Sequence, residues 1–278
     1  MAANENPEIG STIDAGGIAT NYHDSGQGAP VLLIHGSGPG VTAWANWRTV
    51  IPALSQDSRV LAPDMVGFGY TDRPPGMEYT LDGWAGHALA FLDAVGIDRA
   101  RIVGNSFGGA LALALAIRAP QRIDRLVLMG SVGLEFALTP GLDAVWGYQP
   151  SLDNMRALVD LFTWDKRFVT EELVRLRYEA SIRPGYQETY SRMFPAPRQR
   201  GVAALASPEA EIAALANETL IIHGRDDQVI PLDSSIRLHR LIPRSQLHVF
   251  GQCGHWTQIE HNTRFCNLVR DFLGEETG

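Results

Sequence analysis

The sequence contains little cysteine: only Cys253 and Cys266 occur among its 278 residues. Two cysteines form no disulfide framework, and their spacing matches no zinc site. A chain of this length can bury a sizeable core without such cross-links. Because no cluster of His, Asp or Glu has ligand spacing either, we expect no metal and no cofactor. A reducing compartment is the simplest location, and we expect the protein to be cytoplasmic.

An excess of positive charge and a long hydrophobic run are also missing. The chain has 23 Lys and Arg against 31 Asp and Glu, a formal net charge of −8, which argues against nucleic acid as a partner. The longest apolar run, Ala110 to Ile117, is far shorter than the ~20 residues of a membrane-spanning helix. The N-terminal stretch MAANENPEIG lacks the basic and apolar regions of a signal peptide. We therefore expect a small-molecule partner and no membrane.

Short apolar segments alternate between strand and helix patterns along most of the chain. Ser11–Ile13 and Ile18–Tyr22 flank two glycines and predict a hairpin. Continuous apolar runs predict strands buried on both faces at Val31–Ile34, Arg59–Ala62, Arg101–Val103, Arg125–Met129, Thr219–Ile222 and Gln246–Phe250. Helical patterns follow at Trp84–Val95 (with Thr80 as cap), Ser106–Ala119 and Thr263–Phe272. This alternation predicts an α/β fold with a doubly wound, mostly parallel sheet.

The alternation stops at residues 134–206. Leu152–Phe162 has one apolar helical face, and a second helix is predicted after Thr170. We expect this stretch to form a helical lid over the C-terminal edge of the sheet. The core would then consist of residues 1–133 and 207–278, restarting at Ser207 as an N-cap before Pro208.

The segment Gly104-Asn-Ser-Phe-Gly108 carries the strongest chemical signal. It has the G-x-S-x-G pattern and lies between a predicted buried strand and a predicted helix. A sharp strand-to-helix turn projects the central side chain outward, and it needs glycine where a Cβ would collide with neighbouring elements. We predict Ser106 as a nucleophile, next to a helix N-terminus that favours negative charge.

A serine nucleophile needs a base, and the base needs an orienting carboxylate. In folds with this turn the partners follow in the order Ser, Asp or Glu, His. The strand Thr219–Ile222 leads to two acids, of which Asp227 has the usual spacing and Asp226 remains an alternative. His255 lies in a glycine-containing loop after the last predicted strand. We predict Asp227 and His255 as the partners of Ser106.

A loop rich in glycine, His35-Gly-Ser-Gly-Pro-Gly40, follows the first central strand. An acyl-transfer serine needs N–H donors for a developing oxyanion. The backbone N–H groups of Ser37 and Phe107 are the expected pair. The loop matches neither common nucleotide-binding pattern, so a phosphate site is disfavoured.

Several of these motifs together resemble those of a known family, the α/β hydrolases. They are the His35-Gly36 loop, Asp64–Gly69, Gly104–Gly108 and Gly254-His255. Over nearly the full length the chain is similar to the meta-cleavage-product hydrolases, and within them to the 2-hydroxymuconate-semialdehyde hydrolase branch. The narrower likeness rests on His35–Gly40 with Asn46, Gly104–Ser106, Gly251–Gln258, and the stretches Ala144–Tyr148, Arg177–Ser181 and Met193–Pro195.

This resemblance implies hydrolysis of a C–C bond in a 2-hydroxy-6-oxo-2,4-dienoate made by ring cleavage of a monocyclic aromatic compound. The products would be 2-hydroxypenta-2,4-dienoate and formate or another short carboxylate. It also implies a homo-oligomer and a small pocket for the C6 substituent, with Leu142, Trp146 and Phe162 as candidates for its wall. Candidate substrate-binding residues are Gly36, Gly38, Asn46, Asn105, Arg177 and Trp256. Arg177 would bind the carboxylate, with Arg183 as the alternative.

Two other functions fit the same triad. A carboxylesterase or perhydrolase would need no clamp for a substrate carboxylate, so Asn105 and Arg177 separate it from a dienoate hydrolase. A ligand receptor with a retained hydrolase pocket would stall after about one turnover. Haloalkane dehalogenases and epoxide hydrolases are excluded, because both need Asp at the position of Ser106.

Overall fold

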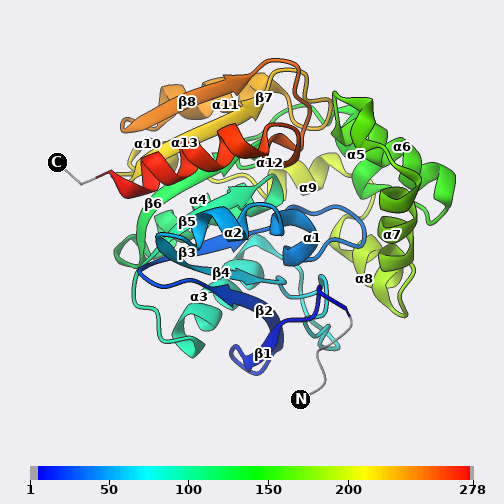
Figure 1. The fold of residues 1–278 in the computed structure, drawn as a ribbon, viewed down its shortest axis with the longest axis horizontal. Coiled ribbons are helices and arrows are strands. Elements are labelled where there is room, and N and C mark those ends of the chain that lie inside the picture. The colour runs from blue at the N-terminus through cyan, green and yellow to red at the C-terminus, as the bar shows by residue number, and fades with distance from the viewer. Residues whose placement is uncertain (1–5, 276–278) are drawn as a thin grey trace.

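The computed structural model describes residues 6–275. Within them the chain forms an eight-stranded sheet in the order β1-β2-β4-β3-β5-β6-β7-β8 (Figure 1). The strands are β1 (Ser11–Asp14), β2 (Ala19–Ser25), β3 (Ala29–Ile34), β4 (Ser58–Pro63), β5 (Ala100–Asn105), β6 (Ile123–Met129), β7 (Glu218–Gly224) and β8 (Ser245–Phe250). β2 pairs antiparallel with β1 and β4, and every later pair is parallel. The predicted α/β class is confirmed.

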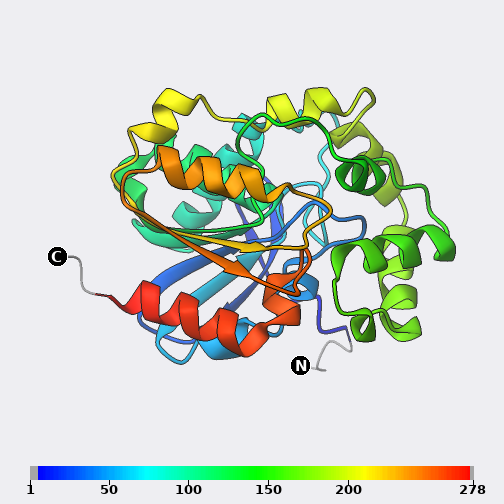
Figure 2. The same ribbon diagram turned by 90° about the horizontal axis from the view of Figure 1, so that it is seen from above.

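Helices cover both faces of the sheet (Figure 2). On one face lie α1 (Ala43–Trp47), α2 (Ile51–Leu54) and α13 (Asn262–Gly274), and on the other α3 (Leu81–Ala94), α4 (Phe107–Arg118) and α11 (Leu232–Leu241). Alternate residues of β3 serve the two sides: Leu32 and Ile34 join one buried apolar cluster, and Val31 and Leu33 join the other. Two-sided burial explains why the central strands have continuous apolar sequences.

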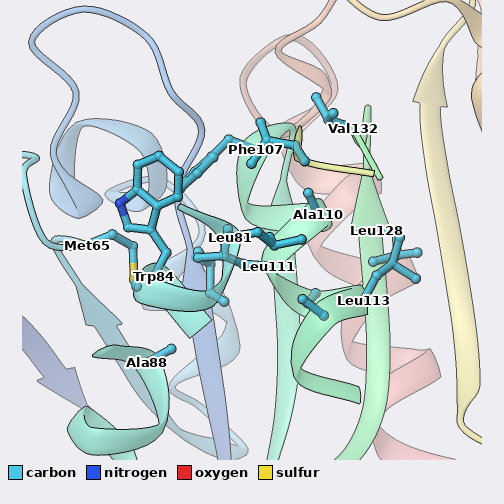
Figure 3. Packing of buried hydrophobic residues seen from close by; sticks show 14 of the residues in the cluster. Met65, Leu81, Trp84, Ala88, Phe107, Ala110, Leu111, Leu113, Leu128 and Val132 are labelled. Atoms are coloured by element: carbon cyan, nitrogen blue, oxygen red, sulfur yellow. The ribbon is translucent and has the colours of Figure 1, made fainter. Parts of the chain in front are cut away.

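Helix α4 packs at the centre of the larger cluster. Its residues from Phe107 to Ala116 are all buried, and its alanines allow a close approach to neighbouring elements. Figure 3 shows Phe107 beside Trp84 of α3, with Leu111 and Leu113 directed into the same apolar region. This packing fixes the start of α4, which directly follows Ser106.

Most helices outside this core come from the segment between β6 and β7. They are α5 (Pro140–Trp146), α6 (Leu152–Phe162), α7 (Glu171–Ser181), α8 (Tyr186–Met193) and α9 (Gln199–Ala204), called the lid helices below. In Figures 1 and 2, α5 to α8 lie together at one end of the sheet. Helix α6 contacts the loop that follows β8, where the Phe162 carbonyl accepts the N–H of His255 at 2.8 Å. The remaining short helices are η1 (Pro120–Arg122), η2 (Lys166–Phe168), α10 (Glu209–Ala213) and α12 (Thr257–Glu260).

Two of the helix caps that the sequence predicts are present in the structure. Thr80 caps α3 and Thr170 caps α7, each hydroxyl accepting a backbone N–H of the first turn. The prediction for Ser207 is wrong: α10 begins at Glu209 with Pro208 as N-cap. Ser207 instead donates its N–H to the carbonyl of Gly133 at 3.0 Å, so the chain turns into the helix one residue later.

The strand Gln246–Phe250 was also expected to be buried on both faces, and this is wrong. β8 is the edge of the sheet, pairs only with β7, and leaves Val249 37% exposed. Helix α11 packs against β8, and most residues of the strand are only partly buried or exposed. Of the part of the chain that the structure describes, no helix is both long and apolar enough to cross a membrane.

Candidate active site

The turn between β5 and α4 holds Ser106 in a conformation that few side chains adopt. Its φ of 55° and ψ of −112° lie outside the usual regions for a non-glycine residue. A Cβ on Gly104 would lie 2.3 Å from the Gly108 carbonyl oxygen, and one on Gly108 would lie 2.3 Å from that of Ile34. The two glycines are thus needed for close backbone contact, as the motif predicts. The surrounding packing holds a strained backbone that presents the Ser106 side chain to a cavity.

His255 and Asp227 form the hydrogen-bonded pair that the chain order predicts. His255 donates from Nδ1 to Asp227 Oδ2 at 2.7 Å, which leaves Nε2 free to accept a proton. Both side chains are nearly inaccessible to solvent. Within residues 6–275 the Ser106 hydroxyl makes no hydrogen bond to His255, although both residues line the same cavity. Such contacts in hydrolases often tighten only with substrate bound.

The carboxylate of Asp227 is held on both oxygens. Its Oδ1 accepts the N–H groups of Val229 and Ile230 at 2.7 and 3.0 Å. Burial raises the pKa of Asp227, but the charge and hydrogen bond of His255, the charge of His223 and the hydrogen bond from the Ile230 N–H together hold the pKa below its usual value. His223, which sequence reasoning did not single out, also lies 3.5 Å from Oδ2. An ionised Asp227 can therefore orient His255 and stabilise its protonated form.

Asp226, the alternative acid, points elsewhere. Its carboxylate faces Arg225 and accepts the N–H of Cys253 at 3.3 Å. Its side chain is 30% exposed, against 1% for Asp227. The geometry favours Asp227 as the partner of His255.

Ser37 and Phe107 lie on the two segments that flank the nucleophile. In the part of the chain that the structure describes, neither backbone N–H donates to another protein group. Phe107 is the first residue of α4, where an N–H has no acceptor within the helix. Its ring is buried against Trp84, 4.7 Å between centroids, so only its backbone could contact a substrate. Ser37 lines the cavity directly.

A cavity of about 320 Å³ lies between these groups and the lid helices. Of the predicted residues, Ser106, His255, Ser37, Gly36, Gly38, Asn46, Asn105, Arg177 and Trp256 line it. The Asn46 Oδ1 atom accepts from Asn105 Nδ2 at 2.8 Å and from the Gly36 N–H at 3.2 Å. Asn46 Nδ2 and Asn105 Oδ1 are buried without a partner among the described residues. One donor and one acceptor next to the cavity thus lack a protein partner.

Comparison with known proteins identifies the family. Residues 29–262 match the family model described as the alpha/beta hydrolase fold. The chain is 62% identical to 2-hydroxy-6-oxo-2,4-heptadienoate hydrolase of Pseudomonas putida strain F1, covering 98% of this chain and 99% of the relative. It is also 62% identical to 2-hydroxymuconate semialdehyde hydrolase of Pseudomonas sp. strain CF600, covering 99% and 97%. The chain belongs to the meta-cleavage product hydrolases of the α/β-hydrolase fold.

A solved structure of this family has the same architecture. It is a serine-to-alanine variant of the meta-cleavage product hydrolase from Pseudomonas fluorescens IP01, complexed with acetates. The TM-score is 0.96 at 62% identity, with 96% of this chain and 98% of that chain covered. The chain is therefore a C–C bond hydrolase of the serine hydrolase type, as the sequence motifs implied.

Arg177 is a buried cation at the cavity of this meta-cleavage product hydrolase. Its residue is 8% exposed, lines the cavity, and makes no ion pair or hydrogen bond within residues 6–275. Burial lowers the pKa of Arg177; the charges of Glu8 and Tyr186 oppose this effect, and those of Arg48 and Arg183 add to it. A buried cation without a carboxylate at ion-pair distance favours binding of an anion.

The alternative cation, Arg183, lies outside the cavity lining. It stacks over the ring of Tyr70 at 4.1 Å and donates from Nε to the Ala180 carbonyl at 3.1 Å. The geometry thus favours Arg177 as the residue that meets a ligand. Arg48, at the C-terminus of the short helix α1, also lines the cavity. Nothing in the sequence pattern marked Arg48, because α1 is only five residues long and has no clear periodicity.

Three residues were expected at the wall near C6. Leu142 and Phe162 line the cavity. Trp146 is not among the lining residues; its ring stacks on Phe194 with centroids 4.6 Å apart. Phe162 in turn stacks on Trp256 at 4.8 Å, so an aromatic wall joins the lid to the loop that carries His255. Among the described residues, no group of three or more His, Cys, Asp or Glu is arranged to hold a metal ion.

Proposed function

We propose that this hydrolase cleaves the C5–C6 bond of 2-hydroxy-6-oxohepta-2,4-dienoate and of 2-hydroxymuconate semialdehyde. The products are 2-hydroxypenta-2,4-dienoate with acetate in the first case and formate in the second. Two relatives at 62% identity carry the names of these activities. The observation that carries the proposal is that Arg177 is buried, has no ion-pair partner among residues 6–275, and lies in the same cavity as Ser106 and His255. A neutral ester has no use for such a cation, whereas a dienoate carboxylate does.

Substrate binding follows from the polar groups of the cavity. Arg177 holds the C1 carboxylate through its planar pair of donors. The free Nδ2 of Asn46 and Oδ1 of Asn105 then meet the 2-oxygen as donor and acceptor. Trp256 packs against the planar dienoate, and the backbone at Gly36 and Gly38 lets the ligand approach closely. These contacts direct C6 toward Ser106.

The chemistry needs an electron sink before the bond can break. The dienol loses its 2-hydroxyl proton and accepts a proton at C5, and so becomes the 2,6-dioxo form, in which C2 is a ketone conjugated with the C3–C4 double bond. Ser106 or a water then adds to C6 while His255 takes the proton at Nε2. The N–H groups of Ser37 and Phe107 stabilise the resulting oxyanion. On cleavage, the C5–C6 electron pair moves into the conjugated system. After attack by water, C6 leaves as a carboxylic acid; after attack by Ser106, it remains as an ester on Ser106 that a water then hydrolyses. One water is consumed in either case.

Two relatives at 62% identity are named for the heptadienoate and the semialdehyde. We therefore expect Leu142 and Phe162, which line the cavity, to face a hydrogen or methyl substituent at C6 rather than a phenyl ring. Residues 134–206 form the lid that closes this cavity, and the described parts of 1–133 and 207–278, which are residues 6–133 and 207–275, form the core that presents the triad. A cytoplasmic location and a homo-oligomer remain predictions.

A multiple-turnover assay on three C6 substituents tests the proposal. The purified protein is mixed with 2-hydroxymuconate semialdehyde, its 6-methyl analogue and its 6-phenyl analogue, and loss of the yellow dienolate is followed. We expect fast turnover of the first two with formate or acetate released, and little turnover of the third. Ser106→Ala should bind the 6-methyl substrate without cleaving it.

Three outcomes would contradict the proposal. Hydrolysis of a simple aryl ester with none of the dienoates would mean a carboxylesterase. Binding of a dienoate with release of about one equivalent of product would mean a ligand receptor. Activity of Ser106→Ala within about tenfold of wild type would remove Ser106 as the nucleophile.

A further inference from the structure

Two lid helices reach down to a single residue of the core, Ser37. The indole Nε1 of Trp146, at the end of α5, donates to Ser37 Oγ at 3.0 Å. The hydroxyl of Tyr190 on α8 lies 2.9 Å from the Ser37 carbonyl oxygen and 2.8 Å from that of Val145. A phenol has one proton, so Tyr190 shares it between these two acceptors. Trp146 and Tyr190 are 2% and 1% exposed, and water does not compete for these bonds.

The peptide on the other side of Ser37 is held by the core. His35 Nε2 accepts the N–H of Met65 at 3.0 Å, which places the ring proton on Nδ1. From there His35 donates to the Gly36 carbonyl at 2.7 Å. Burial lowers the pKa of His35 to about 4, so this neutral tautomer persists at neutral pH.

The Gly36 carbonyl and the Ser37 N–H belong to the same planar peptide unit. His35 therefore sets the plane of the proposed oxyanion donor, and Tyr190 sets the plane of the next peptide. Trp146 fixes the Ser37 side chain between them. Together these bonds leave the Ser37 N–H without freedom to rotate. An oxyanion donor is effective because it is oriented before charge develops and needs no reorganisation.

We propose that Tyr190 and Trp146 are positioning residues for the oxyanion donor at Ser37, so that seating of α5 and α8 completes the site for cleavage. The inference rests on the proposed function, because it takes the Ser37 N–H as an oxyanion donor. It makes the lid part of the catalytic geometry, in addition to its role as a cover for the substrate.

Helix α8 supplies a matched control for Tyr190. Tyr186 lies one turn earlier, is equally buried, and stacks near Tyr190 with ring centroids 6.4 Å apart. Its hydroxyl is among the buried side-chain atoms that have no partner within the described residues. Tyr190→Phe and Tyr186→Phe therefore remove the same atom from the same helix, but only the first change removes bonds to Ser37.

The test compares these variants in steady-state cleavage of the 6-methyl dienoate and in binding of methylboronic acid. A boronic acid adds to the Ser106 hydroxyl as a tetrahedral anion, and so reports the oxyanion donors directly. For Tyr190→Phe we expect kcat to fall roughly tenfold to a hundredfold, somewhat less than on outright loss of a donor. KM should stay within about twofold, because ground-state binding uses Arg177 and the asparagines. Boronate affinity should fall in parallel with kcat.

Ser37→Ala provides a second variant, in which every residue of the lid helices is unchanged. It removes the acceptor of Trp146 while keeping the backbone N–H, and kcat should fall several-fold with KM preserved. Equal kcat and boronate affinity in Tyr190→Phe, Tyr186→Phe and wild type would overturn the inference, as would a loss in KM alone. If wild type does not cleave the dienoate, the proposed function fails, but boronate binding by the same variants still decides the role of Tyr190.

Discussion

Asp226 and Asp227 are adjacent in sequence and differ in what their carboxylates reach. Sequence spacing favoured Asp227 without excluding its neighbour, because both follow the same strand. In the structure Asp227 Oδ2 lies 2.7 Å from His255 Nδ1. The carboxylate of Asp226 instead contacts Arg225 and the N–H of Cys253. The backbone conformation of the loop decides which of two consecutive side chains faces the site. The sequence, which has aspartate at both positions, does not reveal that conformation.

The aspartate pair gives a sharp test of the triad. Asp227→Asn leaves the volume unchanged but can no longer accept the Nδ1 proton of His255 as a carboxylate, and we expect kcat to fall roughly 10³–10⁴-fold. Asp226→Asn serves as the control and should retain kcat within about threefold of wild type. Steady-state cleavage of the 6-methyl dienoate measures both. A larger loss in the Asp226 variant would reverse the assignment.

Arg177 determines whether the cavity selects an anionic substrate. Arg177→Gln keeps a polar side chain but removes the buried charge. We expect kcat/KM for the dienoate to fall roughly tenfold to a hundredfold, the value of a charge-assisted hydrogen bond. Hydrolysis of a neutral aryl ester by the same variant should change less than about threefold. Equal losses on both substrates would assign Arg177 a structural role.

At the scale of elements, the sequence predicted what local chemistry controls. Three features can be recognised directly in the sequence: threonine caps, glycines at the nucleophile turn and apolar runs in central strands. The elements that they predict lie where expected. The short helix α1 and the lid helices α5 and α8 were missed, because five to eight residues carry little periodicity. The edge position of β8 could not be predicted either, since it depends on which strand comes last in the sheet.

Replacing a glycine by alanine should have opposite effects on stability at the nucleophile turn and in helix α3. A Cβ on Gly104 would press on the Gly108 carbonyl at 2.3 Å, whereas one on Gly86 of α3 would meet nothing within 4 Å. Gly104→Ala should lower the free energy of unfolding by roughly 1–3 kcal/mol. Gly86→Ala should raise it by roughly 0.5–1 kcal/mol, since alanine favours the helix. Urea denaturation of the two variants gives both values, and a neutral Gly104→Ala would contradict the account of the turn.

At the scale of the whole molecule, buried titratable groups predict a loss of stability in acid. Burial lowers the pKa of His35 and of His87 to about 4. Between their ordinary pKa of 6.5 and about 4, the unfolded chain binds protons that the folded chain refuses, so stability falls as the pH falls. Burial raises the pKa of Asp64 to about 6, and this opposes the trend because folded Asp64 binds its proton first.

Between pH 7 and pH 5, the stability lost through the two histidines exceeds the stability gained through Asp64. We expect the free energy of unfolding to be roughly 2 kcal/mol lower at pH 5 than at pH 7. Urea denaturation at the two pH values measures the difference. Equal or greater stability at pH 5 would mean that the histidines are not held neutral in the folded protein.

The candidate site shows how far sequence reasoning reaches when distant segments must meet. Chain order predicted Ser106, Asp227 and His255 as partners. The structure places Asp227 at 2.7 Å from His255 and brings Ser106 and His255 to the same cavity. The contacts of Trp146 and Tyr190 with Ser37 span more than a hundred positions of the chain, and no local pattern predicts such a pairing. Residue roles at the site follow from chemistry, but their neighbours follow only from the folded structure.

The most direct test of the central claim is a product balance on 2-hydroxy-6-oxohepta-2,4-dienoate. The purified protein is incubated with a large excess of this substrate, and the products are quantified. We predict one acetate and one 2-hydroxypenta-2,4-dienoate for each substrate consumed, over many turnovers. No consumption of the dienoate alongside brisk hydrolysis of an aryl ester would contradict the account and leave an esterase with an unused cation at Arg177.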